Sequence, residues 1–167
     1  NEEGKITALI SYFDPSIFTE IKESQTKKLN GKVYINHPYI LSVRKAMNAF
    51  VAKDMEKWSA FYAPKAVFSN SSMQVGKYMN LEEYQTTMAA MFFKEDLKFK
   101  VEQMGYPDCI YYEKNDMYVV YSWWKMMYKK DGKVYEYSFM LSHDFNDEGL
   151  IAREHIYMSS NHLDNLR

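Results

Sequence analysis

Cysteine is almost absent from this chain, and its scarcity excludes several kinds of site. Cys109 is the single cysteine in 167 residues. One thiol rules out an internal disulfide and any zinc or iron–sulfur centre built from several cysteines. A lone thiol can act as a nucleophile, but Cys109 follows Tyr106-Pro107-Asp108 in a run typical of a strand. A cysteine in such a run usually behaves as a small buried hydrophobe, and we expect that role here.

Long apolar runs, an excess of one charge and cofactor motifs are also missing. No apolar run approaches the roughly 20 residues of a membrane-spanning helix. The 21 basic and 22 acidic side chains nearly balance, so the chain lacks the basic face that nucleic acids and anionic membranes require. It has no glycine loop for phosphate, no histidine pair at the spacing of a metal site and no nucleophile-elbow pentapeptide. We therefore expect no cofactor, no metal, no nucleic-acid partner and no membrane span.

The chain begins with Asn1 rather than methionine. Either a trimmed chain or the removal of a signal peptide would give such a start, and the first residues are not themselves a signal peptide. The second alternative leads us to expect an exported bacterial protein, in the periplasm or outside the cell.

Residues 1–36 are expected to form a separate lead-in and linker, followed by one domain over residues 37–167. Asp14-Pro15 is a good helix start, since aspartate caps a helix and proline suits its first turn. Residues 24–28 read as an exposed linker before a turn at Asn30-Gly31. The apolar side of the short helix would consist of Ile17, Phe18 and Ile21.

Three helices are predicted at the start of the domain. Pro38 begins the first, because apolar residues then recur at spacings of three and four up to Val51. Asp54 caps a short second helix that Pro64 ends. Asn80 and Glu83 form a capping box for the third. The apolar stripe of that third helix, which we expect to fill the core, consists of Leu81, Tyr84, Met88, Met91 and Phe92.

Strands are predicted for the rest of the chain. Residues 98–104 and 108–114 read as strands, and residues 117–159 read as three more joined by turns at Asp131-Gly132 and at 146–149. Helices followed by a continuous antiparallel meander predict an α+β fold. We expect the helices to pack on one face of a strongly curved antiparallel sheet that forms a cone with a cavity.

The turn at Asp131-Gly132 fixes which residues of the two strands that it joins share a face. Counting outward from it pairs Tyr128 with Tyr135 and Ser122 with Leu141, and period two then places alternate residues together. We assign the more apolar face inward, against the helices. Its expected ligand-binding residues are Tyr118, Ser122, Trp124, Tyr137 and Phe139, with His143 beside them.

Two registers are open for the last strand. If Leu150 pairs with Phe145, Glu154 faces inward across from Leu141 and diagonal to His143, and the two form a candidate acid–base pair. A slip or bulge of one residue reverses the faces. The cavity would then hold a cation and prefer an acidic ligand, and its inward residues would be Arg153, His155 and Tyr157.

The order of several phrases resembles the nuclear transport factor 2-like superfamily, in particular its SnoaL-like branch. The phrases are Lys53-Asp54, Trp58, residues 62–68 (YAPKAVF), Gly76, and residues 147–151 (DEGLI) followed by Tyr157. The resemblance covers about residues 38–160. It implies a cone with a hydrophobic cavity, and homodimers through the outer face of the sheet.

The resemblance allows three functions. The first is binding of a small hydrophobic or aromatic molecule in the cone. The second is cofactor-free isomerisation, cyclisation or dehydration, as in the polyketide cyclases, ketosteroid isomerases and dehydratases of the superfamily, with His143 as base and Glu154 as its partner or the acid. Lys65 and Met158 stand where the family often has acidic residues, so the cyclase residues are not carried over. The third is a non-catalytic homodimer through Tyr121, Trp123 and Met140.

Overall fold

The computed structural model describes residues 4–5, 14–25, 31–94 and 97–159. The chain divides into two compact units, residues 1–30 and 31–167. The first unit contains α1 (Ser16–Gln25), which begins where Asp14-Pro15 predicts. The Asp14 carboxylate accepts a hydrogen bond from the backbone N–H of Ser16 at 2.9 Å. The apolar side chains Ile17, Phe18 and Ile21 are all exposed.

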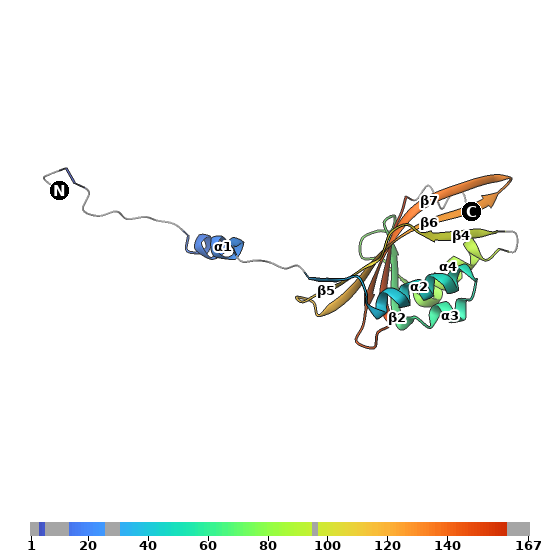
Figure 1. Cartoon of the computed structure of the whole chain (residues 1–167), viewed down its shortest axis with the longest axis horizontal. Coiled ribbons are helices and arrows are strands. Elements are labelled where there is room, and N and C mark those ends of the chain that lie inside the picture. Colours follow the sequence, from blue (N-terminus) through green and yellow to red (C-terminus); the bar gives the residue numbers. More distant parts are fainter. Residues whose placement is uncertain (1–3, 6–13, 26–30, 95–96, 160–167) are drawn as a thin grey trace. The chain divides into compact units, whose positions relative to one another are not determined.

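Helices α2 (Pro38–Val51), α3 (Met55–Ser59) and α4 (Leu81–Phe92) cover one face of a curved sheet (Figure 1). Their starts follow the sequence: the Asp54 carboxylate caps α3, and Asn80 and Glu83 make both bonds of a capping box on α4. Pro64 does not end α3, which stops at Ser59; it lies inside a strand instead.

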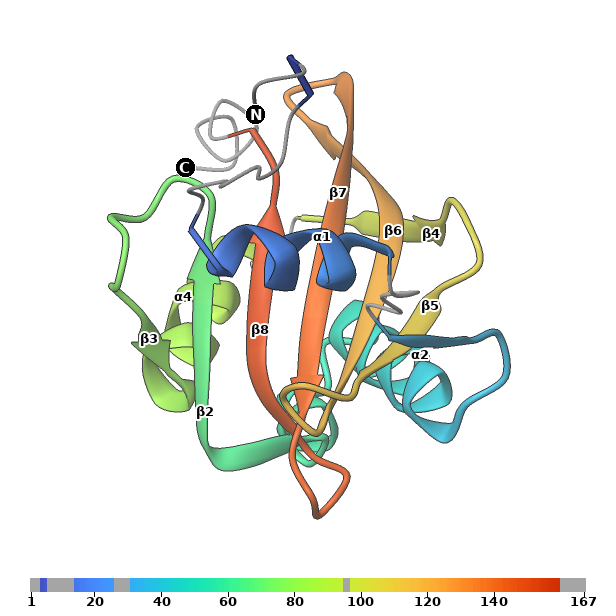
Figure 2. The same cartoon turned by 90° about the vertical axis from the view of Figure 1, so that its left-hand side faces the viewer.

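The described residues form an eight-stranded sheet in the order β1-β5-β6-β7-β8-β2-β3, with β4 also paired to β6. Figure 2 shows β2, β8, β7 and β6 side by side. The strands are β1 (Lys32–Tyr34), β2 (Tyr62–Asn70), β3 (Met79–Asn80), β4 (Phe99–Gln103), β5 (Asp108–Tyr112), β6 (Met117–Lys130), β7 (Lys133–Phe145) and β8 (Ile151–Tyr157).

Two features differ from a continuous antiparallel meander. The strands β4 and β5 do not pair with each other, because each pairs with a different half of the long strand β6. The strands β2 and β8 pair in parallel, so the sheet is antiparallel except at this position.

Strand β1 adds to the edge at β5, and its residues fall within the stretch expected to be lead-in. The boundary predicted at residue 36 stays a prediction.

The β6–β7 register agrees with the turn chemistry. Tyr128 pairs with Tyr135 and Ser122 with Leu141, and the ladder continues unbroken to Tyr118 and Phe145. The turn residues Asp131 and Gly132 have φ of 50° and 77°, which is the left-handed geometry of a tight hairpin turn.

The β7–β8 register differs from the predicted pairing without changing faces. Phe145 pairs with Ile151 rather than Leu150, and an irregularity lies between Asp144 and Phe145. As a result Glu154 lies directly opposite His143, not opposite Leu141. The pairing of Phe145 is shifted by one residue, and the irregularity beside it adds one more, so the total offset of two residues keeps the same side chains inward. Alternation of apolar residues indicates the face of a strand but not an offset of two residues.

We expect Asn80→Ala to lower the free energy of unfolding by about 1 kcal/mol, because the N-cap of α4 is lost. The Asn80 side chain accepts from the backbone N–H of Glu83 at 2.9 Å. Chemical denaturation monitored by circular dichroism measures the change. The control is Asn115→Ala, at an exposed position, which should change stability by less than about 0.5 kcal/mol. Equal effects of the two substitutions would contradict a capping role.

Candidate functional site

A cavity lies between the helices and the inner face of the sheet. About 190 Å³ of it is open to the centres of water-sized molecules. Most of its walls are aliphatic, aromatic or thioether side chains, contributed by α2, α3, α4 and strands β2, β3, β6, β7 and β8. The side chains with polar atoms that line it are Tyr62, Asn70, Tyr84, Thr87, Tyr137, His143 and Glu154, with Trp58 beside them.

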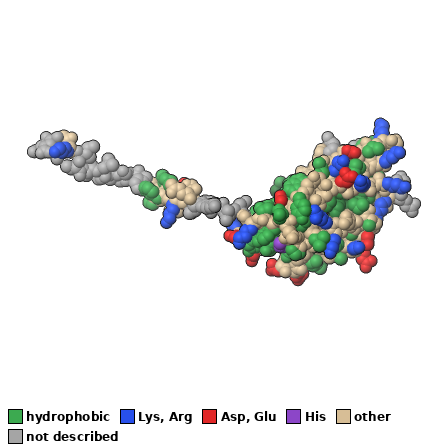
Figure 3. All heavy atoms as spheres, in the orientation of Figure 1, with side chains coloured by type: hydrophobic (Ala, Val, Ile, Leu, Met, Phe, Trp, Pro, Cys, Tyr) green, Lys and Arg blue, Asp and Glu red, His purple; other side chains and the backbone are tan. Residues whose placement is uncertain are grey.

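Glu154 is the only buried carboxylate among the described residues, with 4% of its surface exposed. The other charged side chains visible in Figure 3 lie on the surface, and Lys and Arg gather where β6 and β7 join. Strand β8 sits between β7 and β2, so the inward side chain of Glu154 lies in the middle of the sheet. A charge in such a position needs hydrogen-bond donors around it.

Three donors surround the Glu154 carboxylate. Oε2 accepts from the Tyr62 hydroxyl at 2.5 Å and lies 3.0 Å from His143 Nε2. Oε1 accepts from the Tyr84 hydroxyl at 2.9 Å. Tyr62 comes from β2, Tyr84 from α4 and His143 from β7, so the carboxylate joins three separate elements to β8.

The surroundings of Glu154 hold it in the ionised form. Burial alone would raise its pKa, but the contacts with His143, Tyr62 and Tyr84 together lower the pKa below the ordinary value of 4.5. Burial, and then the nearby Glu154 charge, raise the pKa of both Tyr62 and Tyr84 well above 10.0. Both tyrosines therefore stay protonated and donate hydrogen bonds to the carboxylate.

One ring nitrogen of His143 has a hydrogen-bond partner among the described residues, and the other has none. Because the Glu154 carboxylate accepts, Nε2 carries the proton of this contact. The ring is 2% exposed, and Nδ1 has no hydrogen-bond partner among the described residues. An unsatisfied buried nitrogen costs free energy, so a molecule that bonds to it removes a penalty present in the empty cavity.

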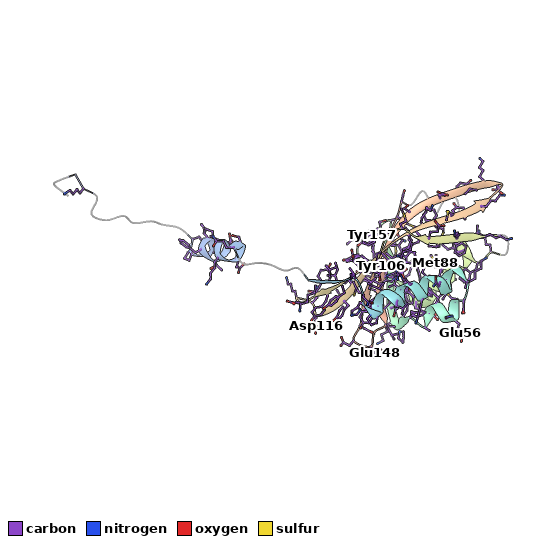
Figure 4. All side chains as sticks on the ribbon, in the orientation of Figure 1. Glu56, Met88, Tyr106, Asp116, Glu148 and Tyr157 are labelled. Carbon is purple, nitrogen blue, oxygen red and sulfur yellow. The ribbon has the colours of Figure 1, made fainter. Side chains whose placement is uncertain are left out.

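The outer part of the cavity is rich in methionine. Among the lining residues, the half-buried ones that mark the opening are Met47, Asn70, Met79, Thr87, Met91, Ile156 and Met158. Thioethers are flexible and polarizable, and they adapt to apolar and aromatic surfaces of different shape. Met88, labelled on α4 in Figure 4, and Met126 add two more deeper in the cavity.

The structure brings together four of the residues expected on the inner face. His143, Glu154, Tyr137 and Phe139 all line the cavity. Glu154 faces inward, as in the first of the two alternatives for the last strand, although its partner on β7 is His143 and not Leu141.

Three other residues of the inner face do not reach the cavity. Trp124 and Ser122 are buried and satisfy each other, with Trp124 Nε1 donating to Ser122 Oγ at 2.9 Å. The Tyr118 ring stacks on His37, with 4.7 Å between ring centroids. The inner face extends beyond the helix-covered hollow, so sharing a face does not ensure sharing the cavity.

His155 and Tyr157, the candidates from the second register, do not line the cavity. His155 Nδ1 lies 2.7 Å from Ser69 Oγ. Tyr157, labelled in Figure 4, is 46% exposed. With Trp123 and Met140 it lines a shallow groove on the outer face of the sheet. Arg153 pairs with Asp144 at 3.1 Å instead of entering the cavity.

Sequence reasoning missed the two tyrosines that bond to Glu154. Tyr84 was placed in the apolar stripe of its helix, and Tyr62 in a family phrase, without a role for either hydroxyl. They lie 70 and 92 positions from Glu154 in the chain, so no local pattern joins them to it. A buried carboxylate that needs donors, together with inward tyrosines on the facing helix, is the signal that would have found Tyr84.

Burial explains the state of Cys109. Cys109 is fully buried and forms no disulfide, and desolvation raises the pKa of its thiol to about 11. A protonated buried thiol is a poor nucleophile.

Among the described residues, no group of three or more His, Cys, Asp or Glu side chains is placed to hold a metal ion. No described helix combines the length and apolar character needed to cross a bilayer.

The chain belongs to the SnoaL-like domain family, whose model matches residues 43–154. No curated protein matches the sequence. The fold is nuclear transport factor 2-like, as the family and the solved structures below show.

Three solved structures share this fold at low identity. An LEH-like epoxide hydrolase of M. tuberculosis has a TM-score of 0.55 and 13% identity, over 77% of this chain and 87% of that one. The β subunit of a Burkholderia mallei benzoate 1,2-dioxygenase has a TM-score of 0.58 and 15% identity, over 74% of this chain and 89% of that one. PrhC of Penicillium brasilianum has a TM-score of 0.58 and 12% identity, over 80% of this chain and 87% of that one. At these identities the similarity establishes the fold alone.

We expect Glu154→Gln to lower the free energy of unfolding at pH 7 by about 3 kcal/mol, because an amide cannot satisfy three donors. The pKa of Glu154 is lowered in the folded protein, so its stabilising contribution is present above the ordinary pKa and is lost as the pH falls through the folded value. The wild type should therefore lose stability below about pH 4.5 more steeply than the variant.

Urea unfolding at a series of pH values measures both effects. The matched control is Glu136→Gln, which removes an exposed carboxylate from β7 and should leave stability at pH 7 within about 0.5 kcal/mol of the wild type. If the pH profiles of wild type and Glu154→Gln ran parallel, the carboxylate would not be ionised in the folded state.

Proposed function

We propose that this domain binds a small, neutral, predominantly apolar or aromatic molecule in the cavity that Glu154 and His143 close at its inner end. The observation that carries the proposal is an apolar hollow with one buried, hydrogen-bonded polar cluster. Binding sites for small molecules combine such apolar walls with a few placed polar groups that set orientation.

The size of the cavity supports a ligand of one or two fused rings. A dry apolar cavity of about 150 Å³ holds benzene in other proteins, and this one offers about 190 Å³ and an opening. The methionines at the opening suit a flat polarizable ring, since sulfur packs favourably at ring edges. The buried Glu154 charge disfavours anionic ligands.

The family supports the same proposal in general terms only. The domain family and its superfamily include cofactor-free isomerases and ligand-binding subunits. Similar structures are named as an epoxide hydrolase and as a dioxygenase subunit. One fold therefore serves several functions, and the site, not the fold, has to identify the function.

Filling the opening should block binding. We expect Thr87→Phe to weaken the affinity for indene, a neutral bicyclic hydrocarbon, by about tenfold or more, because the new ring occupies the space of the ligand. Thr87 lines the cavity. The neighbouring Thr86 is exposed on the same helix, so Thr86→Phe makes the same chemical change outside the cavity and should leave the affinity unchanged.

Calorimetric titration of the purified wild type and both variants measures the three affinities. Thermal unfolding without ligand checks that each variant is folded. Saturable binding to the wild type that Thr87→Phe leaves intact would show that the hydrocarbon binds elsewhere. The absence of binding to the wild type would remove the support for an apolar ligand.

A second function, cofactor-free proton transfer, is favoured by the contact between His143 and Glu154. The carboxylate holds the Nε2–H form of the ring, as an orienting carboxylate does for a general base, and Nδ1 is left to take a proton. Tyr62 and Tyr84 donate to Glu154, so they are not available as donors to an oxyanion. Tyr137, whose hydroxyl donates to the weak acceptor Met126 Sδ at 2.9 Å, is the better candidate for that role.

Proton transfer predicts catalysed exchange at a carbon next to a carbonyl. We expect the wild type to accelerate deuterium uptake from D₂O at the α-carbon of 2-indanone, and Glu154→Gln to reduce this acceleration by about a hundredfold, since a positioned base contributes on that scale. Proton NMR of the ketone follows the exchange, with Glu136→Gln as the control. Exchange no faster than in buffer would leave ligand binding as the function.

The homodimer through Tyr121, Trp123 and Met140 stays a proposal. All three are half-buried on the outer face, and exposed Met104 and Tyr157 extend the apolar area. Light scattering of the purified protein tests it, because a monomer at high concentration would contradict self-association.

A further inference from the structure

The hydrogen-bond capacity of the cluster at the inner end of the cavity is unequally distributed. Each of its three donating groups, the hydroxyls of Tyr62 and Tyr84 and the Nε2–H of His143, contacts the carboxylate of Glu154. A tyrosine hydroxyl has a single proton to donate. The carboxylate therefore takes up the donors that this cluster provides.

The cluster retains hydrogen-bond acceptors that no donor of the described residues occupies. In the neutral ring, Nδ1 of His143 carries a lone pair when Nε2 carries the proton, and it has no partner among the described residues. The hydroxyl oxygens of Tyr62 and Tyr84 also keep lone pairs.

We infer that the ligand of this cavity carries a hydroxyl or N–H group, and that this group donates a hydrogen bond to Nδ1 of His143. The inference rests on the proposed binding function and narrows its ligand class to apolar molecules with one hydrogen-bond donor, such as phenols, alcohols and indoles. Ketones, ethers and esters offer this cluster only further acceptors; the cavity's Tyr137 hydroxyl, which is outside the cluster, donates to Met126 Sδ. Carboxylates add repulsion from the buried Glu154 charge.

Charge and burial agree with this class. His143 and Glu154 are both nearly inaccessible to solvent, at 2% and 4%, so water in the bulk cannot satisfy Nδ1 once a ligand fills the cavity. A ligand without a donor would leave this nitrogen unpaired in an apolar surrounding, and that loss sets the selectivity.

Three molecules of nearly equal shape test the inference. Indole presents an N–H donor, benzofuran presents an oxygen acceptor at the corresponding position, and indene presents neither. We expect calorimetric titration of the wild type to give an affinity for indole about tenfold higher than for indene, since one buried hydrogen bond has about that effect. Benzofuran should bind no better than indene.

The outcomes separate the inference from the proposed function. If indene and benzofuran bind as tightly as indole, or if benzofuran binds most tightly, the donor requirement is wrong while binding of apolar rings stands. If none of the three binds, the proposed function itself fails.

A variant identifies the accepting atom. His143→Met removes Nδ1 and leaves an unbranched apolar side chain, so the ratio of indole to indene affinity should fall to about one. The matched control, His155→Met, removes a histidine that does not line the cavity and should keep the wild-type ratio. An unchanged ratio in folded His143→Met would show that another group accepts the proton. If this variant does not fold, the nitrogen-15 shift of Nδ1 in labelled wild type decides: it should move when indole binds and stay when indene binds.

Discussion

The buried carboxylate of Glu154 is the constraint on which the rest of this structure depends. It needs donors, and it obtains them from β2, β7 and α4, three elements that are distant in the chain. Meeting this need fixes the position of α4 over the sheet, the offset of β8 against β7 and the inward direction of Tyr62. The hollow between the helices and the sheet is what remains when these positions are fixed.

A buried charge is a poor way to gain stability, since apolar side chains of similar volume often do as well or better. Its value lies in specificity. Removing any one of the three donors leaves the carboxylate undersatisfied, and alternative offsets of β8 would place it against Leu141 or on the outer face. The same cluster lines the cavity and leaves Nδ1 of His143 without a partner, so one arrangement serves both the fold and the site.

The sequence predicted the four helices, the strands from β4 onward and the faces of β6 and β7, because these follow from short-range patterns. The Asp131-Gly132 turn sets the β6–β7 ladder, and the capping box on α4 is local. The offset of β8, the parallel pairing with β2 and the division of β6 between β4 and β5 were not predicted. Each depends on a bulge or on a contact between distant segments. For the same reason the inward faces of His143 and Glu154 were predicted, whereas the contacts of the Tyr62 and Tyr84 hydroxyls were not.

The parallel pairing of β2 with β8 also bears on how the chain reaches this state. Val67 pairs with Arg153 and Asn70 with Ile156, so the closing contacts of the sheet join segments more than eighty positions apart. Such contacts carry a large loop-closure cost, and folds dominated by them form slowly. During synthesis, β2 and the helices emerge long before β8, and the apolar faces they present stay uncovered until the last strand leaves the ribosome. This domain is therefore most exposed to aggregation while it is still being made.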